Sequence, residues 1–108
     1  MPLDYRLKKE KDFNLVFNKG KKIYSSSLTL IYLPAKELKA GFAVSKKHGG
    51  SVKRNRVKRL LRESFRSFAP LLSKNFFFVF IPKADKEFSL ELIKKEMNFL
   101  LTKGGFLN

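Results

Sequence analysis

The residues with the clearest chemical character form one basic segment, residues 51–66 (SVKRNRVKRLLRESFR). The segment holds five Arg and two Lys but a single acid, Glu63. At 100° per residue, a helix would place four of its polar residues on one face, namely Asn55, Arg59, Arg62 and Arg66, with Arg56 and Lys58 beside them. We call these six residues the basic ridge. Guanidinium groups donate paired hydrogen bonds that match phosphate oxygens, so the ridge predicts binding of a polyanion.

Stability alone does not explain this arrangement. Solvated helices usually mix acids and bases at i,i+4, whereas the ridge sets like charges beside one another. Lys53, Arg54 and Arg56 also crowd the expected helix N-terminus, where the macrodipole disfavours cations. A phosphate held there by free backbone N–H groups and guanidinium groups would make the arrangement favourable. Binding to a membrane surface is the weaker hypothesis, because a folded core needs the apolar face of this helix.

The remaining polar residues do not form a catalytic set. The chain has no Cys, one His (His48) and nine acids, which are scattered along it. A two-metal nuclease site needs several converging carboxylates, and the spacing predicts none, so we expect no metal site in the protein. No nucleophile–His–acid set and no phosphate-binding loop motif is present either. The sequence therefore does not predict catalysis by the protein alone.

A folded domain must position the basic ridge. With 108 residues, 44% of them hydrophobic and 12 of them Phe, the chain predicts one folded domain over residues 1–108. Its net charge of +15 calls for a polyanionic partner. The longest apolar run, residues 76–81, is too short to cross a bilayer, the N-terminus lacks a signal peptide, and the absence of Cys suits a reducing compartment. We therefore expect a soluble, cytoplasmic protein.

Periodicity and turn residues predict an α+β fold, a single-domain α/β sandwich with the order α-β-β-α-β-α on a small mixed sheet. The first expected element is a helix over 9–19, ended by Gly20. Strands over 27–33 and 39–45 follow, paired as an antiparallel hairpin around the turn 34–37. After them come a helix over 51–68 capped by Ser51, a strand over 75–81, and a last helix from its cap Ser89 to Gly104. Strand 39–45, helix 51–68 and strand 75–81 would form a β-α-β crossover.

Residues 49–65, which follow Val44-Ser45-Lys46-Lys47, closely resemble the Arg-Asn-Arg motif of the bacterial ribonuclease P protein subunit. The N-terminal stretch LKKEKDFNLVFNKGKK is similar to that family's first helix, which has two Phe four residues apart and a closing Gly. Length, charge and element order agree as well, so the resemblance covers nearly the whole chain. It implies that the β-α-β crossover is left-handed, against the general rule.

The resemblance also implies a function. The chain would be the non-catalytic protein subunit of an endoribonuclease, a ribonucleoprotein that removes the 5′ leader from precursor tRNA. The active site and its Mg²⁺ would belong to the catalytic RNA subunit, with no cofactor bound by the protein alone. Catalytic RNA and precursor tRNA would be its partners, with the protein monomeric in the particle and no membrane involved.

Two sets of site residues follow from the resemblance. The residues expected to bind the RNA subunit are Lys53, Arg54, Asn55, Arg56, Lys58, Arg59, Arg62 and Arg66. The residues expected to bind the single-stranded leader, in a cleft between the first helix and the sheet, are Phe13, Phe17, Thr29, Ile31, Ala43, Ser45 and Lys46.

The residues themselves support the leader site in part. Small side chains on one face of strand 39–45 would leave room for RNA, and aromatic rings bind unpaired bases with little sequence preference. Phe13 and Phe17 can each belong to the core or to the cleft, and one can pack while the other lines it. Ile31 stands where the family commonly has an aromatic residue, while Tyr32 points to the other face.

Two other functions stay open on the sequence. The first is a ribosomal or general RNA-binding module with no role in catalysis, which the charge alone would equally suit. The second is a stand-alone nuclease, which cleavage by the RNA-free protein would reveal.

Overall fold

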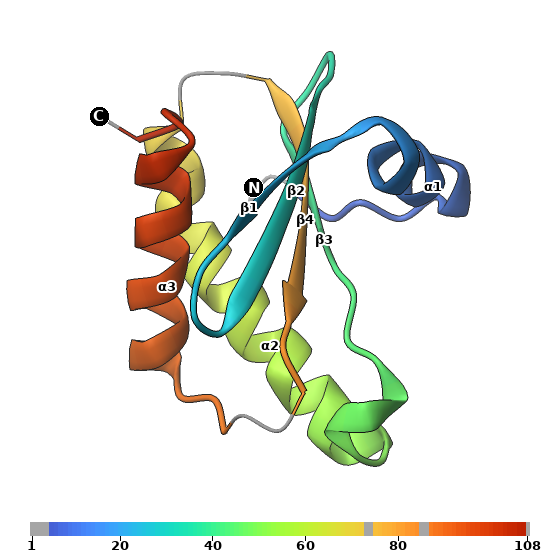
Figure 1. Ribbon diagram of the computed structural model, residues 1–108, viewed down its shortest axis with the longest axis vertical. Coiled ribbons are helices and arrows are strands. Elements are labelled where there is room, and N and C mark those ends of the chain that lie inside the picture. The colour runs from blue at the N-terminus through green and yellow to red at the C-terminus, as the bar shows by residue number, and fades with distance from the viewer. Residues whose placement is uncertain (1–4, 73–74, 85–86, 108) are drawn as a thin grey trace.

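The computed structural model describes residues 5–72, 75–84 and 87–107. In chain order its elements are α1 (Glu10–Lys19), β1 (Lys21–Tyr24), β2 (Leu28–Pro34), β3 (Lys39–Phe42), η1 (Lys46–His48), α2 (Ser51–Phe68), η2 (Ala69–Leu71), β4 (Phe76–Pro82) and α3 (Leu90–Lys103) (Figure 1). This confirms the predicted α+β class, and each predicted helix and strand is present, although the strand predicted over 39–45 ends at Phe42. It adds β1, a strand that the sequence did not predict.

The strand order is β1-β2-β4-β3, with β2 antiparallel to both neighbours and β3 parallel to β4. The predicted hairpin between β2 and β3 is therefore wrong, because β4 lies between them. The physical reason is the composition of β4, which is apolar on both faces and is best buried in the middle of the sheet. β3, α2 and β4 form the expected crossover between neighbouring parallel strands; its left-handed sense stays a prediction.

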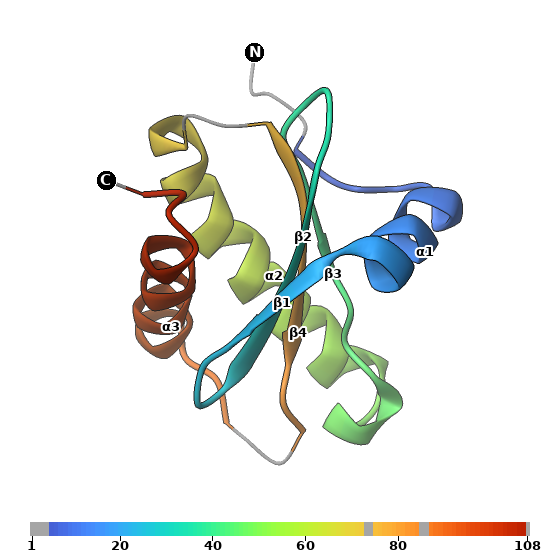
Figure 2. The same cartoon turned by 45° about the horizontal axis from the view of Figure 1, so that its top comes forward.

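Helices cover the sheet on both faces. Figures 1 and 2 show α1 on one side, with α2 and α3 together on the other. Along β4, Phe78 and Phe80 belong to the core on the α2–α3 side, and Val79 belongs to the core on the α1 side. All three side chains are fully buried. The all-apolar sequence of this strand thus serves two cores, one on each face.

The helices α2 and α3 begin differently. The Ser89 hydroxyl accepts a hydrogen bond from the Leu92 N–H (3.1 Å), so the predicted cap of α3 is confirmed. The predicted cap at Ser51 is wrong, because Gly50 is the residue before α2 and Ser51 is its first helical residue. Gly49, at a φ of 116°, makes the turn that leads into the helix. No described side chain caps α2, which leaves its first backbone N–H groups open to a ligand.

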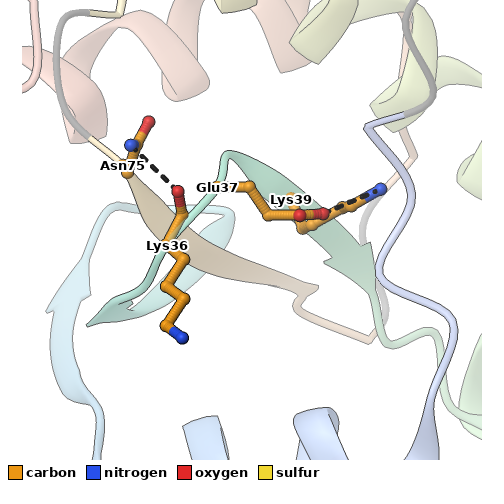
Figure 3. Close-up of polar contacts among 4 residues, drawn as sticks. All are labelled: Lys36, Glu37, Lys39 and Asn75. Atoms are coloured by element: carbon orange, nitrogen blue, oxygen red, sulfur yellow. Dashed lines mark hydrogen bonds and ion pairs between the residues drawn. The ribbon is translucent and has the colours of Figure 1, made fainter.

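The turn between β2 and β3 is held against the start of β4 (Figure 3). The Asn75 side-chain amide donates to the Lys36 carbonyl (3.0 Å), and the Ala35 N–H donates to the Asn75 carbonyl (3.2 Å). Lys39 forms an ion pair with Glu37 across the same turn, at 3.3 Å. These contacts fasten the turn predicted over residues 34–37 although its two strands are not neighbours.

A buried carboxylate from α3 fastens the turn between β1 and β2. Glu96, only 8% exposed, accepts hydrogen bonds from the Ser25 hydroxyl (2.9 Å), the Ser26 hydroxyl (2.9 Å) and the Ser27 N–H (2.7 Å). Burial by itself would raise the pKa of Glu96, but the hydrogen bonds from the three serines outweigh it and lower the pKa below the ordinary value. Glu96 is therefore a charged anchor for the β1–β2 hairpin.

Candidate nucleic-acid interface

Helix α2 has the two faces that its sequence predicts. Its buried residues are Leu61, Ser64 and Phe65. The Phe65 ring lies 5.9–6.5 Å from the rings of Tyr5, Phe42, Phe78 and Phe80, measured between centroids. Phe65 thereby fixes the rotation of α2 on the sheet. Because this face is held inward, the opposite one must face solvent.

The basic ridge occupies that opposite face. Asn55, Arg56, Arg59 and Arg66 are exposed, while Lys58 and Arg62 are half-buried. Within the part of the chain that the structure describes, no basic residue of α2 has an ion-pair partner. The Nε atoms of Arg54 and Arg62 are also shielded from solvent and have no hydrogen-bond partner in these ranges. The ridge is a concentration of positive charge that the protein itself does not neutralise.

A hollow lies on each side of α2. On the side of β3, a space of about 200 Å³ is lined by Lys58 and Arg62 together with Phe13 and Gly41. On the other side, a space of about 190 Å³ is lined by His48, Lys53 and Arg56, with Phe88 at its wall. The first hollow joins the ridge to the α1 side of the sheet, so the two predicted sites adjoin each other.

His48 is held in place by the end of β4. Its Nε2 lies 3.0 Å from the Pro82 carbonyl oxygen, and its ring lies 6.0 Å from that of Phe88. A carbonyl oxygen only accepts, so Nε2 carries the proton in this contact. The contact ties the loop before α2 to the sheet and fixes the position of the helix N-terminus.

On the α1 side, one row of residues crosses the sheet without being buried. Tyr24 on β1 is paired with Thr29 on β2, and Thr29 is paired with Ile81 on β4. Ala43 follows β3 and continues its ladder by donating to the Phe80 carbonyl (3.0 Å). Thr29, Ile81 and Ala43 are half-buried, and Tyr24 is 57% exposed. We call these four residues the open row.

The neighbouring row lies beneath α1. Val16 of α1 is fully buried against Ile31 and Val79, which are 1% and 0% exposed. Ile31 therefore lies in the core, and its predicted contact with the leader is corrected. The prediction had the right face of β2, and Thr29, which it also named, is the residue of that face that lies in the open row. Ser45 and Lys46, beyond the end of β3, are exposed as a binding role requires.

The two aromatic residues of α1 lie differently. The rings of Phe13 and Phe17 are stacked, with centroids 6.5 Å apart and planes at 25°. Phe13 is half-buried and rests on Gly41, leaving no room there for even a Cβ atom. Phe13 thus fills the position directly over Gly41, which the prediction had left for RNA, and the hollow of about 200 Å³ lies beside its ring. Phe17 is 39% exposed and offers the more accessible ring.

Sequence reasoning missed Tyr24 and Ile81 as members of this surface. Tyr24 lies on β1, a four-residue strand too short for a periodic signal, and three of its four residues are exposed. Ile81 lies in the predicted strand, but only the pairing of β4 with β2 shows that it stands beside Thr29. Among the described residues, no group of three or more His, Asp or Glu side chains is placed to hold a metal ion. None of the helices in the same ranges is long and apolar enough to cross a membrane.

Comparisons with known proteins agree with this geometry. The family model of ribonuclease P matches residues 1–105. The ribonuclease P protein component of Bacillus velezensis is 38% identical over 101 residues, which are 91% of this chain and 87% of that protein. The corresponding protein of Caldanaerobacter subterraneus has the same identity over the same shares of the two chains.

Solved structures extend the comparison to the fold. The RNase P protein of Staphylococcus aureus superposes with a TM-score of 0.86 at 25% identity, covering 98% of this chain and all of that one. The RNase P protein of Thermotoga maritima gives a TM-score of 0.81 at 26% identity, covering 91% of this chain and 96% of that one. The family model, the relatives and the fold agree, and this chain belongs to the bacterial ribonuclease P protein family.

Proposed function

We propose that this protein assembles with the catalytic RNA of ribonuclease P and promotes removal of the 5′ leader from precursor tRNA. The observation that carries the proposal is the pairing of two adjoining surfaces, one cationic and one apolar and aromatic. The first suits a folded RNA, whose phosphates it would neutralise. The second suits unpaired bases, which stack on accessible rings.

In this proposal the basic ridge docks on the RNA subunit. The exposed Arg56, Arg59 and Arg66 donate to phosphate oxygens, and the half-buried Lys58 and Arg62 do so at the edge that faces β3. Lys53 and Arg54 act at the uncapped N-terminus of α2, where open N–H groups add to the attraction for an anion. Asn55 makes a directional contact with its amide.

The leader of the precursor lies along the open row in this proposal. Phe17 stacks on a base, Phe13 supports the Phe17 ring from the side of β3, and Thr29 and Ala43 form the floor. Ser45 and Lys46 contact the backbone where the row meets the basic ridge. Contacts made by ring faces and small side chains accept any base, which a processing enzyme with many substrates requires.

We further propose that the chemistry belongs to the RNA, with its Mg²⁺ bound there. On this account the protein positions precursor tRNA and neutralises phosphates, and it transfers no proton. Such a subunit matters most when Mg²⁺ is scarce, because protein cations then replace counterions at the RNA backbone.

Reconstitution tests the proposal. The protein, its cognate catalytic RNA and a precursor tRNA are mixed at low Mg²⁺, and leader release is compared with that by the RNA alone. Faster cleavage on addition of protein is the expected result. Tight binding of the protein without faster cleavage would favour the general RNA-binding module, and cleavage by the protein without the RNA would favour the nuclease.

A further inference from the structure

We infer that Tyr24 extends the leader site to the far edge of the sheet and stacks on a leader base further from the cleavage site than the base held by Phe17. This inference rests on the proposed function, because it names an additional contact for the same substrate. No role for this residue follows from the motifs in the sequence, since β1 itself was not predicted. It comes from the register of β1 on β2.

The register places the Tyr24 ring on the α1 side of the sheet. Side chains alternate along a strand, and Ile23, the preceding residue, packs on the α2–α3 side, with its Cδ1 atom close to Gly104. Tyr24 must therefore point the other way. Its partner Thr29 stands beside Ile81, which packs on the α1-side core. Tyr24 is thus the outermost member of the open row.

The Tyr24 ring is free to receive a ligand. It is 57% exposed, and within the described ranges it has neither a ring partner nor a hydrogen bond. The backbone beneath it is nonetheless held firmly. The Ser25 N–H donates to the Leu28 carbonyl (2.9 Å), and the Glu96 carboxylate binds the three serines that follow Tyr24. An accessible ring on a fixed turn loses little conformational entropy when a base stacks on it.

The position of Tyr24 sets which part of the leader it can meet. β1 and β3 are the two outer strands of the sheet, three strand spacings or about 14 Å apart. The basic ridge adjoins the β3 edge, so a leader that leaves the RNA subunit there passes Ala43 and Thr29 before it reaches Tyr24. Only a leader long enough to cross the sheet can contact the Tyr24 ring.

Phe99 provides a matched control. It is an aromatic residue of similar exposure, 51%, but it lies on α3, on the other side of the sheet from α1 (Figure 2). A general loss of exposed aromatic surface would affect Phe99→Ala and Tyr24→Ala alike. Tyr24→Phe keeps the ring and removes only the hydroxyl, so it separates stacking from a hydrogen bond.

The experiment measures the affinity of the reconstituted holoenzyme for a series of precursors whose leaders lengthen one nucleotide at a time. Mature tRNA, which has no leader, is the reference. We expect Tyr24→Ala to weaken binding about fivefold or more, but only beyond a threshold leader length. That threshold should exceed the one at which Phe17→Ala takes effect. Tyr24→Phe and Phe99→Ala should bind every precursor as the unchanged protein does.

The outcomes separate the two proposals. If Tyr24→Ala has no effect at any leader length while Phe17→Ala acts selectively on precursors, the inference fails and the leader site stands. If Phe17→Ala also weakens binding of the precursor no more than binding of mature tRNA, the leader site itself is wrong. An equal loss for Tyr24→Phe and Tyr24→Ala, or for mature tRNA, would overturn the stacking role.

Discussion

The basic ridge and the open row are built in different ways. All six residues of the ridge come from one helix, Ser51–Phe68, so helical spacing alone brings them together. The open row takes single residues from β1, β2 and β4 and from the segment after β3, which only sheet register makes neighbours. A binding surface on one helix is therefore encoded locally. A surface across a sheet depends on the whole fold.

The largest effect should come from breaking the support that the ridge needs. Phe65→Ala removes a buried ring that contacts four others, and we expect it to lower the free energy of unfolding by about 3–5 kcal/mol. Denaturant unfolding measures this. A loss below about 1 kcal/mol would show that α2 is held to the sheet elsewhere.

Removing charge from the ridge should weaken RNA binding without unfolding the protein. For Arg59→Ala/Arg62→Ala we expect the log–log slope of affinity for the catalytic RNA against salt to fall by about 1 for each charge removed. The matched control is Lys94→Ala/Lys95→Ala, which removes the same charge from exposed positions on α3. Equal slopes for the two double variants would mean that net charge matters and the ridge does not.

The anchor of the β1–β2 hairpin should show a defined pH dependence. Glu96→Ala leaves the Ser27 N–H and the Ser26 hydroxyl without their acceptor, while the Ser25 hydroxyl keeps the Leu28 carbonyl at 3.2 Å. We expect the free energy of unfolding to fall by about 1–3 kcal/mol. Because folding lowers the pKa of Glu96, this carboxylate stabilises the protein above the ordinary glutamate pKa of about 4.3. That stabilisation is lost as the pH falls through the folded-state pKa.

Unfolding of the unchanged protein and of Glu96→Ala over a pH series measures this contribution. The difference in the free energy of unfolding between the two proteins should be largest near neutral pH and should shrink in acid. A difference that stays constant, or grows as the pH falls, would contradict the assignment of Glu96 as a charged acceptor.

The smallest effect concerns the one uncharged member of the ridge. Asn55→Ala removes a directional contact, whereas Asn55→Asp also brings a negative charge among phosphates. We expect affinity for the catalytic RNA to fall more for Asn55→Asp than for Asn55→Ala, and the gap between them to narrow at high salt. Equal losses would leave Asn55 with only a structural role near the start of the helix.

The contrast between the two surfaces also explains what the sequence could predict. The apolar spacing of α2, the glycines before it and Pro70 after it define both ends of the helix, and the structure confirms the range 51–68. Ser51 was misplaced by one residue, because either Gly50 or Ser51 can precede a helix and the conformation of Gly49 decides between them. Local signals were sufficient wherever the feature was local.

Non-local features were beyond such signals. The sequence placed Ile31 on the correct face of β2, but whether that row is covered depends on where Val16 of α1 rests. The order of the strands depends on β4, which follows β2 by more than forty residues and yet lies beside it. β1 was not predicted, because its four residues show no apolar–polar alternation that distinguishes a strand from a loop.

The central claim is that the two surfaces serve different RNAs, and Phe17→Ala tests it most directly. The measurement is the affinity of the reconstituted holoenzyme for precursor and for mature tRNA, with thermal melts of the free protein. Leu15→Ala is the matched control, since Leu15 is 38% exposed against 39% for Phe17 but faces the other side of α1, beside Leu33 and Phe77.

We predict that Phe17→Ala weakens precursor binding by roughly 1–3 kcal/mol and leaves mature tRNA binding and the melting temperature unchanged. Leu15→Ala should cause no selective loss of affinity for the precursor. Equal loss for both tRNAs would contradict the account. A large drop in melting temperature without selective loss would show that Phe17 serves packing and does not bind the leader.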